Sequence, residues 1–261
     1  MSSLRPRVIP CLQVADRELL KTRRFKDPVY LGDPINAVKI LNDLDCDELI
    51  VVDIGATLNK REPDYELIEE FASEAFMPLA YGGGIHSVEQ VRRILSIGIE
   101  KVVICTAAVD GEFISAAAAM FGSQSIVASI DVRKSPAGRD QVWTRSGTHN
   151  TGSEPCAYAA QMEDQGAGEL FVQSIDREGT RTGYDLTLMK EISSTVKIPV
   201  IASGGAGCLE DIRQLLRSSR VAGAAGGTMF VLHGKHNAPL ISYPRSDLIA
   251  SLGDTQTSPA R

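Results

Sequence analysis

Short, continuously apolar runs alternate along this chain with longer segments in which apolar residues recur at a helical spacing. A run that is apolar on both faces is typical of a strand buried in a parallel sheet. Strands are therefore predicted at residues 7–14, 48–54, 77–80, 101–105, 125–131, 170–175, 199–202 and 222–227. Helices are predicted between them at residues 33–45, 65–75, 87–95, 113–120 and 156–165. This alternation indicates an α/β fold.

The chain also contains an internal repeat. Residues 78–85 read PLAYGGGI, and residues 199–206, which lie 121 positions later, read PVIASGGA. The same shift aligns residues 48–51 with 169–172, and slightly different offsets align the first and fourth strands of each half. Two copies of four strand–helix units predict a closed TIM (β/α)8 barrel rather than an open sheet. We expect one barrel over residues 1–245, with half-repeats at about 7–122 and 125–232.

Three segments stand outside this alternation. Residues 15–33 are predicted as a long loop, either a solvated connection or a mobile cover whose cations attract an anionic substrate; its length favours the cover. Residues 133–153 are predicted to insert a small hairpin after the fifth strand. Residues 246–261 are expected to form a C-terminal tail that is partly disordered, above all at 255–261.

Composition disfavours several classes of protein. The formal net charge of −6 makes nucleic acid an unsuitable partner. No apolar run approaches the length of a membrane span and no signal peptide is recognised, so we expect no membrane association. The five cysteines are scattered without a C-x-x-C pair, which favours a reducing, cytoplasmic location. The four histidines share no metal-ligand spacing, and we expect neither a metal nor a cofactor.

Glycine and polar residues gather where the predicted strands end, which is the rim of a β/α barrel that carries the active site. Glycine pairs there bring backbone N–H groups close to an anion. One candidate phosphate pocket consists of Gly83, Gly84 and Thr106, and the other of Gly204, Gly205, Gly227 and Thr228. Two such pockets suit a long substrate with a phosphate at each end.

Other polar side chains are expected between the two pockets: Gln13, Asp53, Asp131, Ser174 and Asp176. Asp131 ends an apolar strand, where a carboxylate does chemistry, pairs with a lysine or caps the next loop. Chemistry is the interpretation we favour, because burial near like charges raises a carboxyl pKa toward the range useful for proton transfer. Ser174 lacks a His/Asp arrangement that would make it a nucleophile.

Specific motifs recur through most of the chain: IPCL at 9–12, DEL at 47–49, YGGGI at 81–85, TAAV at 106–109, FGSQ at 121–124, SIDR at 174–177 and ASGGAG at 202–207. With them the chain resembles the HisF family, the cyclase subunits of imidazole glycerol phosphate synthase, from about residue 7 to residue 230. The resemblance implies a lyase-type synthase subunit of a glutamine amidotransferase complex. Family members take ammonia from a HisH-like glutaminase docked at the bottom of the barrel and use it to cleave and cyclise a bis-phosphorylated aminoimidazole carboxamide nucleotide in histidine biosynthesis.

The resemblance also assigns roles to individual residues. Asp131 matches the family's catalytic acid, and Lys21 matches a substrate-binding lysine. Four charged residues match the positions of the family's ammonia gate: Arg7, Glu48, Lys101 and Glu169.

Two positions depart from the family pattern. Gln13 stands where the family has its catalytic base, an aspartate, and an amide accepts no proton at neutral pH. Cys105 replaces an asparagine. Residues 230–244 instead resemble the HisF-like proteins of surface-polysaccharide gene clusters, in which a barrel and a glutaminase supply ammonia to a separate sugar amidotransferase.

Three functions therefore stay open. The first is ammonia supply for acetamidino modification of a lipopolysaccharide (O-antigen) sugar, and the second is the histidine-pathway cyclase. The third is a non-catalytic ammonia conduit or scaffold that binds and stimulates the glutaminase.

Overall fold

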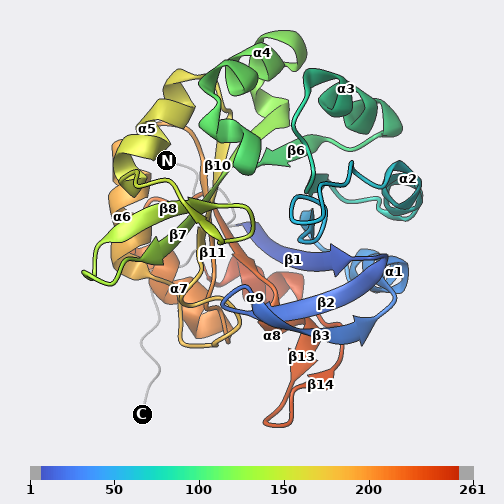
Figure 1. The fold of residues 1–261 in the computed structure, drawn as a ribbon. Coiled ribbons are helices and arrows are strands. Elements are labelled where there is room, and N and C mark those ends of the chain that lie inside the picture. Colours follow the sequence, from blue (N-terminus) through green and yellow to red (C-terminus); the bar gives the residue numbers. More distant parts are fainter. Residues whose placement is uncertain (1–6, 253–261) are drawn as a thin grey trace.

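Parallel strands close into a barrel in the computed structural model, which describes residues 7–252 (Figure 1). The strands follow one another around the barrel in chain order: β1 (Arg7–Ala15), β4 (Leu49–Asp53), β5 (Leu79–Gly82), β6 (Lys101–Ile104), β7 (Ile126–Lys134), β10 (Glu169–Ser174), β11 (Val200–Ser203) and β12 (Gly223–Gly226). Parallel pairing of β12 with β1 closes the ring, and β6 pairs with β7 to link the halves. The predicted TIM barrel is confirmed.

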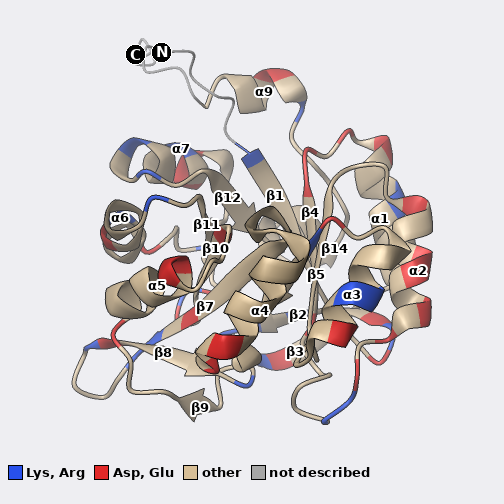
Figure 2. Cartoon of the chain, turned by 90° about the horizontal axis from the view of Figure 1, so that it is seen from above, with Lys and Arg blue, Asp and Glu red and all other residues tan. Residues whose placement is uncertain are grey.

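Helices surround the strands, with α1 to α3 on one side and α5 to α7 on the other in the view of Figure 2. Their bounds are α1 (Pro34–Asp43), α2 (Tyr65–Glu74), α3 (Val88–Ile97), α4 (Gly111–Phe121), α5 (Pro155–Asp164), α6 (Leu186–Thr195), α7 (Leu209–Ser218), α8 (Thr228–Val231) and α9 (Ser246–Ala250). Hydrogen bonds between side chains and the backbone fix where several of these helices begin. The Asp33 carboxylate accepts hydrogen bonds from the first N–H groups of α1, and Ser87 and Gln90 form a capping box on α3.

Two apolar layers form the core. The larger lies between strands and helices, and the smaller fills the barrel interior. The interior layer consists of Ile9, Cys11, Ile50, Ala80, Val103, Val127, Phe171, Ile201 and Ala225. Burying both faces of each strand explains why the strands read as continuous apolar runs.

The prediction of a loop at residues 15–33 is wrong. Strand β1 turns back into β2 (Glu18–Arg23) and β3 (Lys26–Gly32), an antiparallel extension beside β1 in Figure 1. Each turn has two residues of positive φ, Asp16–Arg17 and Arg24–Phe25, which is the backbone of a tight hairpin turn. Neither turn contains the glycine that normally signals it, so the sequence pattern pointed to a loop.

The other additions are one predicted hairpin and two elements that the sequence analysis did not predict. The predicted insertion is a hairpin in which β7 pairs with β8 (Asp140–Thr144), and β8 pairs with β9 (His149–Asn150). Near the C-terminus, β13 (Leu232–His233) and β14 (Ala238–Pro239) form a second hairpin. Residues 246–252, expected in the tail, include α9, whose Ile249 is buried in the main core. Residues 255–261 lie outside the described range.

Gly83 provides a test of backbone packing at the barrel mouth. A Cβ on Gly83 would lie 2.5 Å from the Asp53 carbonyl oxygen, whereas one on Gly98 would meet nothing within 4 Å. Both glycines have positive φ, +124° and +115°. Gly98→Ala is expected to cost about 1 kcal/mol of unfolding free energy through backbone strain alone, and Gly83→Ala about 1–3 kcal/mol more through overpacking. Urea unfolding measures both, and equal losses would contradict the packing argument.

Candidate functional site

A cavity of about 390 Å³ opens at the carboxyl ends of β1, β4, β5, β6 and β7. It is the rim where the sequence placed the site. Of the predicted site residues, the cavity is lined by Gln13, Asp53, Gly83, Gly84, Thr106 and Asp131. Cys105, Ser129 and Phe25 also line it, and Phe25 comes from the β2–β3 hairpin. These residues belong mainly to the first half of the barrel, so the cavity lies on that side of the barrel mouth.

Asp131 is buried beside two weak donors. The Ser129 hydroxyl lies 3.4 Å from its Oδ1, and the Cys105 thiol lies 3.5 Å from its Oδ2. Burial raises the pKa of Asp131 to about 7, and it outweighs these hydrogen bonds and the charge of Arg133, which lower it. A carboxyl group that holds a proton near neutral pH can donate that proton to a bound molecule.

The backbone of the first candidate phosphate pocket turns sharply, as expected. Gly83 and Gly84 both have positive φ, and the Asp53 carboxylate next to them accepts hydrogen bonds from the N–H groups of Gly55 and Ala56. The Thr106 hydroxyl accepts one from the Arg145 N–H at 3.0 Å. Burial raises the pKa of Asp53, against those two hydrogen bonds. The loop therefore combines sharp turns with fixed dipoles at the cavity wall.

The residues of the second pocket lie around a different part of the mouth, and none of them lines the cavity. Gly204 and Gly205 have positive φ, and a Cβ on Gly204 would lie 2.5 Å from the Ser174 carbonyl oxygen. Thr228 is buried, and its hydroxyl has no hydrogen-bond partner within residues 7–252. The Asp176 carboxylate accepts the Lys134 N–H at 2.9 Å, so it ties the β10–α6 loop to β7.

A buried polar cluster separates the two sides of the mouth. Lys21 forms an ion pair with Glu178 and donates to the Thr22 carbonyl at 2.9 Å. The Gln13 side chain lies between Thr22 and Glu178. Its oxygen accepts hydrogen bonds from the N–H and the hydroxyl of Thr22, both at 2.9 Å, and its nitrogen donates to Glu178 at 3.2 Å. Glu178 was missed by the sequence analysis, although it closes the run 174–178 that contains the SIDR motif.

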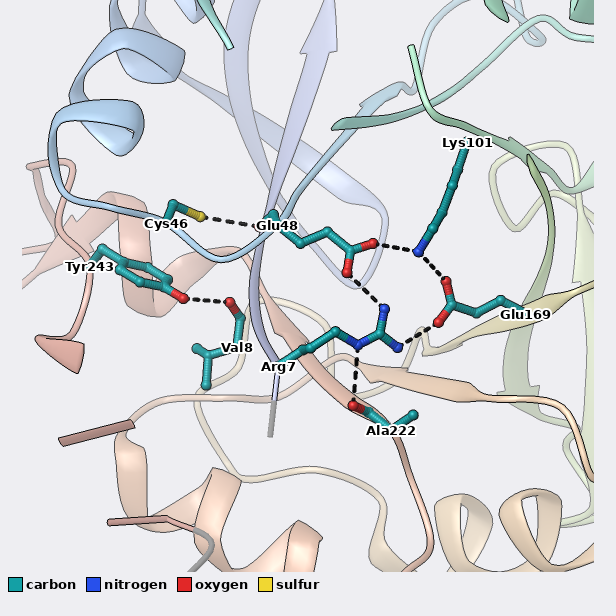
Figure 3. A network of polar contacts seen from close by, with 8 residues as sticks. All are labelled: Arg7, Val8, Cys46, Glu48, Lys101, Glu169, Ala222 and Tyr243. Carbon is teal, nitrogen blue, oxygen red and sulfur yellow. Dashed lines mark hydrogen bonds and ion pairs between the residues drawn. The ribbon is translucent and has the colours of Figure 1, made fainter. Parts of the chain in front are cut away.

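The four predicted gate residues meet at the opposite rim, where the strands begin (Figure 3). Arg7 bonds Glu48 at 2.8 Å and Glu169 at 2.5 Å, and Lys101 bonds the same two carboxylates at 2.9 Å each. Both carboxylates are buried. Burial acts to lower the pKa of Lys101, but hydrogen bonds and the charges of Glu169 and Glu48 outweigh it, and the net pKa is raised. The ring alternates in charge and spans the barrel floor.

Among residues 7–252, no group of three or more His, Cys, Asp or Glu could hold a metal ion. Within residues 7–252, no helix is long and apolar enough to cross a membrane.

The pKa of Asp131 leads to a testable pH dependence. Its value of about 7 lies above the ordinary 3.8, so the native state keeps a proton that the unfolded chain has lost. The unfolding free energy therefore falls as pH rises from about 4 to 7, by about 4 kcal/mol at most. Asp131→Asn removes this loss. Its stability relative to the original protein, from urea unfolding, is expected to increase across that window, and a pH-independent difference would contradict the assignment.

The family model for histidine biosynthesis proteins matches residues 7–237. A Pseudomonas aeruginosa protein, provisionally named imidazole glycerol phosphate synthase subunit hisF2, is 50% identical over 242 residues, which cover 92% of this chain and 96% of that protein. A similarly named HisF of Leptospira borgpetersenii is 44% identical over 92% of this chain and 96% of its own.

A third relative is named as an imidazole glycerol phosphate synthase subunit without a provisional label. The imidazole glycerol phosphate synthase subunit HisF of Limosilactobacillus fermentum is 42% identical over 229 residues, 87% of this chain and 88% of that protein. The likeness spans the barrel, its mouth and its floor. The chain therefore belongs to the HisF family of imidazole glycerol phosphate synthase subunits.

Proposed function

We propose that this chain is the ammonia-receiving synthase subunit of a glutamine amidotransferase complex, paired as a heterodimer with a HisH-like glutaminase. The observation that carries the proposal is the ring of Arg7, Glu48, Lys101 and Glu169 beneath the apolar interior layer. Its four ion pairs satisfy every charge without a counterion from solvent. A neutral molecule such as ammonia that passes this ring enters an apolar interior that leads toward the mouth.

The floor of the barrel also suits a protein partner. Phe76, in the turn before β5, is 85% exposed, and the Asn42 side chain accepts its N–H at 3.0 Å. Leu44, at the end of α1, is exposed as well. Exposed aromatic and aliphatic residues on the same rim as a charged ring are typical of an interface core with a polar surround.

The product pathway that we propose is acetamidino modification of a surface-polysaccharide sugar, with a sugar amidotransferase as the final recipient of ammonia. Two features favour it: Gln13 in place of the family's base, and residues 230–244. In the structure this segment is tied to the barrel floor. The Tyr243 hydroxyl donates to the Val8 carbonyl at 2.8 Å and accepts the Asp47 N–H at 3.2 Å.

The second candidate is the histidine-pathway cyclase, which acts on a bis-phosphorylated ligand. It is favoured by Asp131 and its pKa of about 7, by the glycine turns of both pockets, and by the unpartnered Thr228 hydroxyl, which suits a phosphate oxygen. A non-catalytic conduit is the third candidate. It would use the floor and leave the mouth without a chemical role.

Removing one cation from the ring tests the ammonia-receiving role. Lys101→Ala leaves two buried carboxylates with Arg7 alone, so the ring no longer closes the floor. We expect the fraction of glutamine-derived ammonia that escapes into solution to rise several-fold in the complex with the glutaminase. An ammonia-detecting assay measures the escape.

Lys101→Arg is the matched control, because it keeps the charge, and it should stay close to the original protein. Thermal unfolding of both variants separates a gating effect from loss of the fold. Equal ammonia escape from the alanine variant and the original protein would overturn the proposal.

Ammonium-driven turnover distinguishes the two pathways. Free ammonium bypasses the glutaminase, so cyclisation of the aminoimidazole carboxamide nucleotide then reports on the barrel mouth alone. With Gln13 in place of a base, we expect a kcat about 10-fold or more below that of the L. fermentum HisF measured alongside. A kcat equal to that relative's would select the histidine pathway.

A further inference from the structure

A carboxylate that the family comparison did not assign lies directly behind the position of the missing base. The side chain of Glu178 is 5% exposed, and it touches both Gln13 and Lys21. It reaches the mouth from the β10–α6 loop, where Gly179 allows the β2–β3 hairpin to approach; a Cβ there would lie 2.5 Å from the Thr22 carbonyl oxygen. The Arg24 N–H donates to the Glu178 carbonyl at 2.9 Å, so the hairpin is held to this loop.

The orientation of the Gln13 amide follows from its partners. The Thr22 backbone N–H can only donate, so the Gln13 oxygen must face it. The Gln13 nitrogen then faces Glu178, whose paired carboxylate can only accept. Gln13 also lines the cavity. Glu178 is therefore one hydrogen bond away from a cavity-lining group.

Lys21 lies where its ammonium could leave the Glu178 carboxylate and bind a phosphate group of a ligand. Its ammonium has three hydrogens, and Glu178, the Thr22 carbonyl and the Gln13 oxygen at 3.5 Å account for them. Its stem runs past the second pocket, because a Cβ on Gly227 would lie 2.9 Å from Lys21 Cε. The buried Thr228 hydroxyl beside Gly227 has no hydrogen-bond partner among the described residues 7–252. A phosphate between Thr228 and Lys21 would complete that hydroxyl's bonding and draw the lysine away from Glu178.

We propose that Glu178 is the proton-accepting carboxylate of this barrel. It becomes free to accept a proton when a ligand phosphate binds Lys21 and breaks the ion pair between Lys21 and Glu178. This inference rests on the proposed ammonia-receiving role and adds the class of step: amination of a carbonyl in a phosphorylated ligand. In the acetamidino pathway a separate sugar amidotransferase performs the amination, so this step belongs to the cyclase candidate.

The step conserves protons between the ligand and the two side chains. Ammonia forms a C–N bond with the carbonyl carbon while the C=O π bond breaks. Asp131 gives its proton to the carbonyl oxygen and becomes a carboxylate. Once Lys21 has moved to the phosphate, Glu178 takes one proton from the new cationic nitrogen through a water in the space that the ammonium leaves, and becomes a carboxylic acid. The product is a neutral carbinolamine, and the two side chains together keep one proton throughout.

The test uses the full chain, ammonium chloride and the bis-phosphorylated aminoimidazole carboxamide nucleotide. Glu178→Gln is expected to lower kcat about 100-fold and to leave KM within a few-fold. Lys21→Met is expected to raise KM, since it removes a phosphate contact, and to keep most of kcat. A role limited to holding Lys21 would instead give both variants the same kinetic change.

A double variant keeps the test valid if Glu178→Gln leaves a buried lysine unpaired and unfolds. Lys21→Met with Glu178→Gln removes both charges together, and its kcat is expected about 100-fold below that of Lys21→Met alone. Equal kcat values for those two proteins would overturn the proposal, as would an original protein with no turnover. Neither outcome bears on ammonia receipt, which the Lys101 variants judge separately.

Discussion

Closure of the parallel barrel is the constraint on which everything else depends. Strand β12 must pair with β1, and its sequence GAAG provides the room: a Cβ on Gly223 would already lie 3.1 Å from the Ile9 side chain. Because all the barrel strands are parallel, their carboxyl ends share one rim and their amino ends the other. The mouth and the charged floor therefore lie at opposite ends of one apolar interior.

Buried carboxylates have cationic partners on the floor of the barrel, whereas Asp131 in the mouth has uncharged hydrogen-bond partners. On the floor, Glu48 and Glu169 each contact two cations, and neither carboxylate stays unpaired. In the mouth, the Asp131 carboxylate accepts hydrogen bonds from a thiol and a hydroxyl rather than from a cation, and burial raises its pKa. A ring of paired charges suits a gate for a neutral molecule, whereas a carboxyl without a cationic hydrogen-bond partner suits a group that exchanges its proton.

The twofold repeat is broken where the mouth is most specific. Both halves keep glycine turns of positive φ, yet the cavity lies on the side of the first half. The β2–β3 hairpin and the cluster of Lys21, Thr22, Gln13 and Glu178 occupy the other side. A repeated backbone therefore carries an asymmetric distribution of charge, with an open cavity on one side of the mouth and a buried polar cluster on the other.

The sequence by itself determined the barrel, the repeat and the residues at each rim. Period, glycine position and strand-end polarity are local properties, and Gly83, Asp131 and Lys101 lie where those properties place them. Tertiary structure alone decided which polar groups meet. Glu178 is 165 residues from Gln13, and no local pattern reports a contact over that distance. The hairpin at 15–33 was hidden for a related reason, because its turns use Asp16–Arg17 and Arg24–Phe25 without glycine and depend on pairing with β1.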